Sequence, residues 1–350
     1  MRNQKTVLVL GAGASHGFGL PLGNELKQQI ATDLNIKFDD FGHSLGSGSH
    51  EIVDALRLLV RDENGHNGDI NPHRASAVSI ARAMSLSGSI DEFVERHRDD
   101  SKVAECAKLG IAKAILEAER RSTIYGDHRN TRDDLIGDGS DSWLAHMLRI
   151  LTARLNNQQL ISAFTNLHII NFNYDRCFEN FVFLWFQQVY GLDEATAAQI
   201  SNSIQVYHPF GKLGDLPFQD PSSHIAFGGE IDSQRLILIA SRIRTYSEAV
   251  NEDSELRAAR EALGRADKIV YLGFAFHEQN MDLLQIPSEF ERSTIRAYAT
   301  TQGISAPRLG IDKQRVSSSF RLQSASNLFF EGVDGDCEKF WTEYGDVVVQ

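Results

Sequence analysis

The chain has 350 residues, 42% of them hydrophobic and 23% charged, a composition typical of one large α/β domain or of one domain with a sizeable insertion. Its net charge of −12 argues against a broad nucleic-acid-binding surface, which needs a basic patch. Arg2 and Lys5 precede an apolar run too short for a signal peptide, and the longest apolar run, 181–186, is far shorter than a membrane span. We therefore expect a cytoplasmic protein that binds neither membranes nor nucleic acid directly.

The first feature along the chain is an apolar run, Val7–Leu10, that leads into a glycine-rich turn at 11–19. The run is typical of a buried parallel strand, and a polar helix is expected to follow at Asn24–Leu34. Glycines leave bare backbone that a pyrophosphate can approach, and the N-terminus of the next helix would direct free amides at its charge. The stretch predicts a nucleotide site, although such turns also occur without a ligand.

Two familiar nucleotide-binding loops do not fit this turn. It has no Gly-x-x-x-x-Gly-Lys-Ser/Thr, so it is not a P-loop. The third glycine of the dehydrogenase fingerprint Gly-x-Gly-x-x-Gly is replaced by His16. The acidic residue that should end a second strand is also missing, because Asp33 and Asp39 fall in a helix end and a loop. Hydride-transfer chemistry is therefore disfavoured.

The segment 45–160 has helical periodicity almost throughout and no convincing strand. Ser89 fits the N-cap of one of its helices, with Glu92 at the capping-box position. Polar loops interrupt the segment at 61–73 and 122–142. We expect residues 45–160 to form a helical insertion or subdomain on a core made of residues 1–44 and 161–350.

From residue 167 onward, short apolar runs alternate with helical segments. The expected strands are Leu167–Asn171, Ile204–Tyr207, Leu236–Ile239, Lys268–Leu272, Ile295–Ala299 and Leu328–Phe330. The expected helices are Arg176–Tyr190, Ser254–Ala266 and Cys337–Tyr344. This alternation predicts an α/β fold with a Rossmann-like, doubly wound parallel sheet, in which ligands bind beyond the carboxyl ends of the strands.

Polar residues stand at those strand ends. Asn171, Asn173 and Asp175 alternate, so they share a face in extended chain, although Asn173 or Asp175 could simply cap the next helix. His208 lies where a strand meets a glycine-bearing loop, and a lone histidine is usually structural. The late strand opens at Gly273, and Asn280 could be a plain helix cap there. Together with the glycine-rich turn after Val7–Leu10, these make four such strand ends on one edge. Four are stronger evidence for a site than any one of them.

The motifs together resemble those of the sirtuin family. Gly11-Ala-Gly-Ala-Ser15 followed by Gly19-Leu-Pro21 resembles the family's Gly-Ala-Gly-Ile-Ser … Gly-Ile-Pro loop, and Asn171–Asp175 resembles its Thr-Gln-Asn-Ile-Asp motif. The stretch 207–211 resembles the histidine–glycine motif, and 269–276 resembles the late glycine strand that contacts the cofactor. The resemblance covers about residues 5–25 and 165–300.

The resemblance implies a role for each matching residue. Asp175 would bind the nicotinamide carboxamide, Asn173 would orient the ribose and the attacking water, and His208 would accept a proton from a ribose hydroxyl. The residues that would hold NAD are Gly11, Ala12, Gly13, Ala14, Ser15, Gly19, Pro21, Gly273, Phe274 and Asn280. NAD would be the substrate, and no metal is required.

Two departures from the family narrow this expectation. The chain has three cysteines, Cys106, Cys177 and Cys337, and so lacks the family's four-cysteine zinc module. Leu22-Gly23 also replaces the phenylalanine–arginine pair. The chain looks like the zinc-free branch in bacterial anti-phage systems, which implies NAD hydrolysis to nicotinamide and ADP-ribose, a homo-oligomer, and a partner such as a HerA-type ATPase or an Argonaute-like protein.

Two alternative functions stay open at this point. One is a subunit that senses NAD or ADP-ribose and regulates a partner without catalysis. The other is an NAD-dependent deacylase or ADP-ribosyltransferase, and the missing zinc module counts against deacylation but not against transfer.

Overall fold

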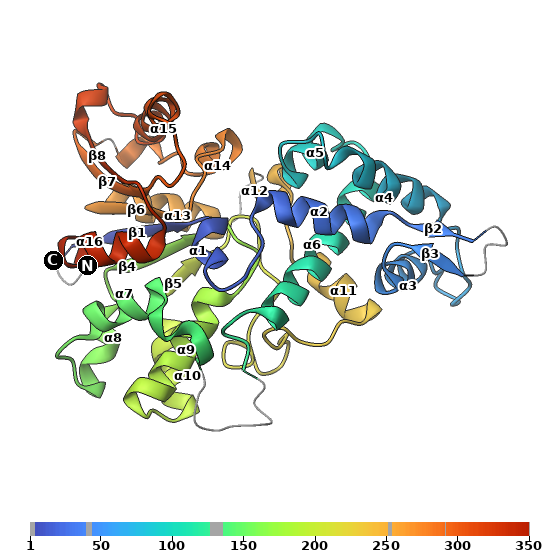
Figure 1. Cartoon of the computed structure of the whole chain (residues 1–350), viewed down its shortest axis with the longest axis horizontal. Coiled ribbons are helices and arrows are strands. Elements are labelled where there is room, and N and C mark those ends of the chain that lie inside the picture. Colours follow the sequence, from blue (N-terminus) through green and yellow to red (C-terminus); the bar gives the residue numbers. More distant parts are fainter. Residues whose placement is uncertain (1–3, 40–43, 127–135, 251–253, 291, 350) are drawn as a thin grey trace.

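A six-stranded parallel sheet forms the centre of the protein (Figure 1). The computed structural model describes residues 4–39, 44–126, 136–250, 254–290 and 292–349. The strands are β1 (Thr6–Leu10), β4 (Leu167–Asn171), β5 (Gln205–Tyr207), β6 (Lys268–Leu272), β7 (Ile295–Thr300) and β8 (Leu328–Val333). Their spatial order is β5-β4-β1-β6-β7-β8, the order of a doubly wound dinucleotide-binding sheet. The predicted Rossmann-like α/β fold is confirmed.

The strand order reverses next to β1. From β1 the sheet continues through β4 and β5 on one side and through β6, β7 and β8 on the other. Leu10 lies level with Asn171 of β4 and with Leu272 of β6, so the loops that follow these three strands leave the sheet at the same edge. In sheets of this kind, the reversal point is where a crevice for a ligand opens.

Helices cover both faces of the sheet because its buried strands are apolar on both sides. Leu8 and Leu10 face the layer of α7 (Trp143–Thr152), α9 (Cys177–Tyr190) and α16 (Cys337–Val349). Val7 and Val9 face the opposite way, toward α13 (Ser254–Arg265), as expected from the alternation of side chains along a strand. Further elements of these layers and connections are α1 (Ala12–His16), α8 (Leu160–Ala163), α10 (Glu194–Ser203), α14 (Glu278–Leu283), α15 (Ala306–Ser319) and the short 3-10 turns η1 (Gly137–Asp141), η2 (Asn157–Gln159), η3 (Ser288–Phe290) and η4 (Ala325–Asn327).

A group of helices extends beyond the carboxyl edge of the sheet, to the right in Figure 1. Its members are α2 (Gly23–Leu34), α3 (His50–Leu59), α4 (Asn71–Ala83), α5 (Ile90–Arg96), α6 (Ser101–Arg121), α11 (Ser233–Ala240) and α12 (Tyr246–Val250). The long helix α6 packs against α2, α4 and α11, and α11 also packs against α3. Thus α2 and α11, which lie outside residues 45–160 in sequence, are packed with helices from inside that segment. By contrast, α7 lies within the segment but packs against α16 and α9 in the sheet layer.

Several sequence predictions are corrected by the structure. The expected strand at Leu236–Ile239 is part of α11, because Asp232 caps a helix there by accepting a hydrogen bond from the Arg235 amide. A four-residue apolar run cannot be told from a buried helix segment by its pattern alone. A two-stranded antiparallel ribbon, β2 (Lys37–Phe38) with β3 (Leu45–Ser47), lies where only loop and helix were expected.

Other local predictions are confirmed. Ser89 accepts a hydrogen bond from the Glu92 amide at 3.0 Å and so caps α5, although the Glu92 carboxylate pairs with Arg96. The apolar run 181–186 lies within α9, where Phe181 and Phe186 are fully buried. None of the helices in the described part of the chain combines the length and the apolar character that crossing a bilayer requires.

Candidate functional site

The glycine-rich loop after β1 is packed directly onto the loop after β6. The amide of Gly11 donates to the Leu272 carbonyl, and the amide of Gly13 donates to the Gly273 carbonyl, both at 3.0 Å. A short helix, α1, follows β1 directly and was not predicted, while the helix predicted at Asn24–Leu34 is present as α2. Two of the amides expected to face a ligand therefore bind the neighbouring strand end instead.

Three of the predicted NAD-binding glycines are explained by this close packing. A Cβ at Gly11 would lie 2.5 Å from the Gly273 oxygen, and one at Gly13 would lie 2.7 Å from the Gly273 Cα. Gly273 itself has φ +57, and a Cβ there would lie 2.2 Å from the Ala14 nitrogen. Gly19 differs, since its φ of +88 favours glycine but its nearest neighbour would be 3.9 Å away. The two loops thus meet backbone to backbone at the reversal point of the sheet.

Ser15, Asn173 and Asp175 form one buried hydrogen-bonded network at this edge. The Ser15 hydroxyl donates to Asp175 Oδ1 at 3.0 Å, and Asn173 Nδ2 donates to Ser15 Oγ at 3.1 Å and to the Gly11 carbonyl at 3.0 Å. Asn171 Oδ1 accepts from the Asn173 amide and holds the turn that follows β4. The sequence placed these residues on one edge, and the structure brings their side chains into contact.

Asp175 has a structural role as well. Its Oδ1 accepts a hydrogen bond from the Cys177 amide at 3.0 Å at the start of α9, but the N-cap of that helix is Arg176, so Asp175 is not its capping residue. Burial raises the pKa of Asp175 to about 6, although the bonds from Cys177 and Ser15 act in the opposite direction. The Cys177 side chain also hydrogen-bonds the Asp175 carboxyl, whereas Asn173 Oδ1 accepts no hydrogen bond from the described residues. Asn173 Oδ1 therefore keeps its acceptor capacity.

His208 lies next to this network, held between two acceptors. Its Nε2 is 2.8 Å from Glu179 Oε1, and its Nδ1 is 3.4 Å from the Asn173 carbonyl. Its backbone amide donates to Glu255. The His208 side chain is buried, so a substrate hydroxyl reaches the ring only if it replaces the longer contact at Nδ1.

Glu179 is the residue that sequence reasoning missed. It lies in the first turn of α9 and is buried beside His208, with Lys212 Nζ at 3.7 Å. Burial would raise the pKa of this carboxyl, but the charges of His208 and Lys212 and the hydrogen bond from His208 outweigh it and lower the pKa to about 2. Glu179 is the one charged residue in an otherwise apolar and polar-neutral helix, and that is the signal that points to it.

Two further contacts connect the site to the helices around it. The Tyr174 hydroxyl donates to Asp91 Oδ1 of α5 at 2.7 Å, and burial raises the pKa of Asp91. The Trp143 indole of α7 donates to the Ala14 carbonyl at 2.7 Å and so holds α1. These contacts come from a part of the chain with no resemblance to the family motifs.

The remaining predicted residues lie around this network. Ala12, Gly13, Gly273 and Asn280 are partly exposed, Gly19 is exposed, and Phe274 is buried. Asn280 is not a helix cap, because α14 begins two residues earlier, at Glu278. Within the described chain, the side chain of Asn280 makes no hydrogen bond to the Ser15–Asn173–Asp175 network.

A small cavity borders the far side of Glu179. It has a volume of about 100 Å³ and is lined by Glu179, Ser201 and Lys212 among others. Glu179 Oε2 and Ser201 Oγ are both buried without a hydrogen-bond partner in the described chain. Unpaired polar atoms beside a polar cavity of this size indicate a place for bound water.

Among the residues that the structure describes, no three His, Cys, Asp or Glu side chains come together as a metal site, and the metal-free scheme remains a prediction. Comparison of the chain with protein-family models gave no matching family, and comparison with curated proteins gave no significant match.

Proposed function

We propose that the protein is an NAD⁺ glycohydrolase that cleaves the nicotinamide–ribose bond with water and releases nicotinamide and ADP-ribose. The observation that carries the proposal is the network of Ser15, Asn173 and Asp175, which lies at the reversal point of a doubly wound sheet and touches His208. Sheets of this order bind dinucleotides at that position. The resemblance to sirtuin motifs assigns NAD⁺ as the ligand.

The reaction needs the protein to hold the nicotinamide carboxamide, to orient the attacking water and the ribose, and to accept a proton. The pyridinium bond breaks with both electrons leaving on nicotinamide, and water adds to an oxocarbenium-like ribose carbon. Asn173 Oδ1 is an acceptor that no described residue uses, so it is available to a water or hydroxyl, and the Asp175 carboxyl would accept from a carboxamide NH₂ group. His208 would take a proton from a ribose hydroxyl, the ribose oxygen would regain one from the attacking water as it adds, and Glu179 would stabilise the imidazolium until its proton passes to solvent.

The close contact of the two loops supports a narrow site. Because the Gly11 and Gly13 amides are used within the protein, we expect fewer backbone contacts to the pyrophosphate than the glycine pattern alone predicts. Ala12, Gly13 and Gly273 form the partly exposed floor of this edge and are the positions where the phosphates would approach. We propose Gly19, Pro21, Phe274 and Asn280 as its rim.

The test is to incubate the purified full-length chain with NAD⁺ and to quantify nicotinamide, ADP-ribose and mass-shifted protein. Asn173→Ala and His208→Ala are each expected to lower the rate at least about 100-fold, because they remove a group that acts on the reacting ribose. Exposed residues of the same types provide matched controls, Asn24→Ala on α2 and His66→Ala in the loop after α3, and both should keep the wild-type rate. Full turnover in either site variant would contradict the assignment.

One observation favours the sensing alternative. His208 is buried, and both of its ring nitrogens face acceptors of the chain itself. This arrangement is typical of a histidine that stabilises the fold. If the protein binds NAD⁺ with measurable heat but releases no nicotinamide, and Asn173→Ala abolishes that heat, the sensing function is supported instead. Mass-shifted protein would indicate ADP-ribosyl transfer.

We further propose, from the resemblance alone, that the activity serves to deplete NAD in anti-phage defence. A HerA-type ATPase or another defence protein would then switch it on, and the enzyme would act as a homo-oligomer. Coexpression with such a partner, followed by measurement of cellular NAD during phage infection, tests this role.

A further inference from the structure

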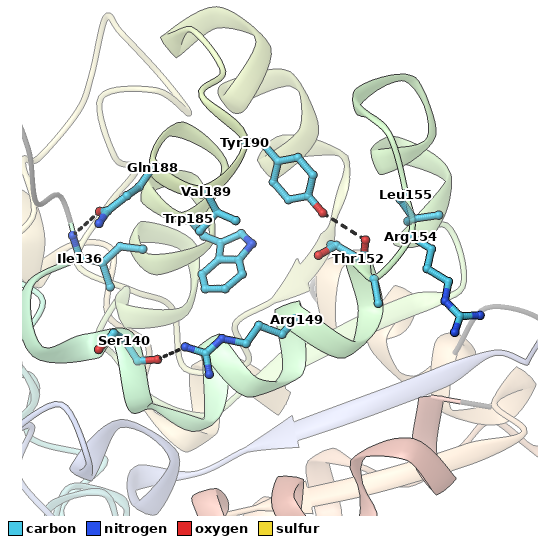
Figure 2. Close-up of a pocket in the computed structure, with 11 residues that line it drawn as sticks. Ile136, Ser140, Arg149, Thr152, Arg154, Leu155, Trp185, Gln188, Val189 and Tyr190 are labelled. Atoms are coloured by element: carbon cyan, nitrogen blue, oxygen red, sulfur yellow. Dashed lines mark hydrogen bonds between the residues drawn. The ribbon is translucent and has the colours of Figure 1, made fainter.

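A second cavity lies on the outer side of the α7–α9 layer. Its volume is about 580 Å³, and its walls come from α7, from the last turns of α9 and from the segments that flank α7 (Figure 2). The helix α9 carries Glu179 in its first turn and Val189 in its last, and ten residues of helix separate them by about 15 Å. The cavity is therefore separate from the Asp175–His208 site.

One buried donor in this cavity has no partner. Trp185 is 4% exposed, and its Nε1 makes no hydrogen bond within the described chain. Figure 2 shows the indole nitrogen facing the middle of the ring of lining side chains. Because a buried indole N–H normally finds an acceptor, the missing acceptor is expected to come from a bound molecule.

The charges of the lining are of one sign. Arg149 and Arg154 both line the cavity, and the described lining includes no acidic side chain. Arg149 donates to the Ser140 carbonyl and makes no ion pair with a described residue. Arg154 follows the end of α7 with φ +66, a backbone conformation that arginine rarely adopts, and lies at the edge of the cavity. Indole and guanidinium donors, with no carboxylate among the described lining residues, favour an anion.

The rest of the lining is apolar or already paired. The Tyr190 hydroxyl donates to the Thr152 carbonyl at 3.1 Å, and Gln188 Oε1 accepts from the Ile136 amide at 3.0 Å. The rings of Trp185 and Tyr190 provide flat apolar surface, and Val189 is an apolar side chain left half exposed beside them. Flat rings beside an anion subsite are suited to a ligand with a planar body.

We propose that this cavity binds a planar organic phosphate, with the phosphate held by Arg149 and the Trp185 indole N–H and the planar part packed on the aromatic side chains. The site is independent of the proposed NAD⁺ glycohydrolase activity.

Phenyl phosphate is the probe, titrated into the full-length chain by calorimetry at low ionic strength. We expect saturable binding of one molecule per chain, at least about tenfold tighter than inorganic phosphate or phenol, because only phenyl phosphate has both parts. The affinity should also fall with added salt. Absence of binding, or equal affinity for either half-probe, would overturn the proposal.

Four variants locate the site. Arg149→Gln should weaken binding at least about tenfold, since it removes a charged donor. Trp185→Phe keeps a ring but removes the N–H and should weaken binding about threefold or more. Arg57→Gln, a matched change in an exposed α3 ion pair, and Asn173→Ala, at the proposed catalytic edge, should both bind as the wild type does.

Arg149 is exposed, so its variant is expected to fold, and thermal unfolding monitored by circular dichroism verifies this for each protein. Wild-type affinity in a folded Arg149→Gln, or loss of binding in Asn173→Ala, would show that phenyl phosphate binds elsewhere and would overturn the assignment.

Discussion

Two buried ion pairs lie within one turn of each other on α9, and they are built differently. Arg176 and Glu119 are both fully buried, and both side chains make several hydrogen bonds within the chain. Glu119 accepts from the Arg176 side chain, from the Arg176 amide and from the Gly228 amide, while Arg176 also donates to the Ile225 and Ala226 carbonyls. This pair joins α6, α9 and the loop before α11 into one unit.

The His208–Glu179 pair is equally buried but incomplete. Glu179 Oε1 binds His208 and lies near Lys212, whereas Oε2 has no partner in the described chain and borders the 100 Å³ cavity. The histidine's second contact is a 3.4 Å approach to the Asn173 carbonyl. In this pair, Glu179 Oε2 is thus left without a hydrogen bond from the described residues.

Both pairs are buried, so the completeness of their hydrogen bonds distinguishes a structural pair from a functional one better than burial does. A charged pair with all its hydrogen bonds made within the chain has nothing left for a ligand, so it is expected to stabilise the fold alone. A pair that leaves an oxygen unpaired beside a cavity keeps a free energy cost that natural proteins rarely retain without a use. On this reasoning, removing Arg176 should affect stability, and removing Glu179 should affect activity.

The largest effect is expected from Arg176→Met. The change leaves the Glu119 carboxylate buried without its cation, which should cost about 3–5 kcal/mol of the free energy of unfolding. Urea denaturation measures it. Arg57→Met, in an exposed pair with Asp54, is the matched control and should change stability by about 0.5 kcal/mol or less. A loss at Arg176 as small as that of the control would contradict the expectation that the Arg176–Glu119 pair stabilises the fold.

Asp175 is the third buried carboxyl of this region and has hydrogen bonds but no cation. Folded Asp175 keeps its proton up to about pH 6, whereas the unfolded side chain loses it near 3.8, so its contribution to stability is present at low pH and is lost as the pH rises between these values. Stability measured for Asp175→Asn relative to wild type should therefore rise by about 3 kcal/mol between pH 4 and pH 7.

The matched control for this measurement is Asp193→Asn. Asp193 is an exposed helix cap whose pKa is lowered by the Thr196 amide, so its pH dependence has the opposite direction. A relative stability of Asp175→Asn that does not vary with pH would mean that Asp175 titrates normally.

Glu179→Gln tests the expectation that the His208–Glu179 pair serves activity. Gln keeps the shape and a hydrogen bond to His208 but loses the charge, so kcat for NAD⁺ hydrolysis should fall about 10- to 100-fold with little change in KM. Because the two residues act as a unit, adding Glu179→Gln to His208→Ala should lower the rate no further. Glu343→Gln, exposed on α16, is the control. Additive losses in the double variant would break the pairing of Glu179 with His208.

The smallest effect distinguishes a satisfied hydroxyl from an unsatisfied one. Ser15→Ala removes two hydrogen bonds of the network and should cost about 1–2 kcal/mol. Ser201→Ala removes a hydroxyl that has no partner in the described chain and should leave stability within about 0.5 kcal/mol of wild type. Equal losses at both serines would show that water in the small cavity stabilises the Ser201 hydroxyl as much as the network stabilises that of Ser15.

Much of the fold followed from local pattern. β1, β4 and β6 were predicted because strands buried on both faces of a parallel sheet are continuous apolar runs. The run at Leu236–Ile239 has the same composition but lies in α11, where Leu236 and Ile239 are buried and Leu238 is half exposed. Nothing in four residues distinguishes these cases, since what decides is the surface against which the run packs.

The candidate site was predictable in one respect only. Ser15, Asn173 and Asp175 follow strands whose ends meet at one edge, so their proximity follows from the topology. The partner of His208 did not follow, because Glu179 reaches the ring from a helix face 29 residues away in sequence. Side-chain pairing of this kind depends on how α9 is rotated against the sheet.

By itself, the sequence determined the six strands of the parallel sheet and which polar residues lie at their ends, because hydrophobic periodicity and chain order are local properties. Tertiary structure alone decided what those residues do for one another. It showed that Gly11, Gly13 and Gly273 permit backbone contact between two loops, and that Glu179 keeps an unpaired oxygen behind His208. Contact distances and unsatisfied atoms arise only when distant segments of the chain pack together.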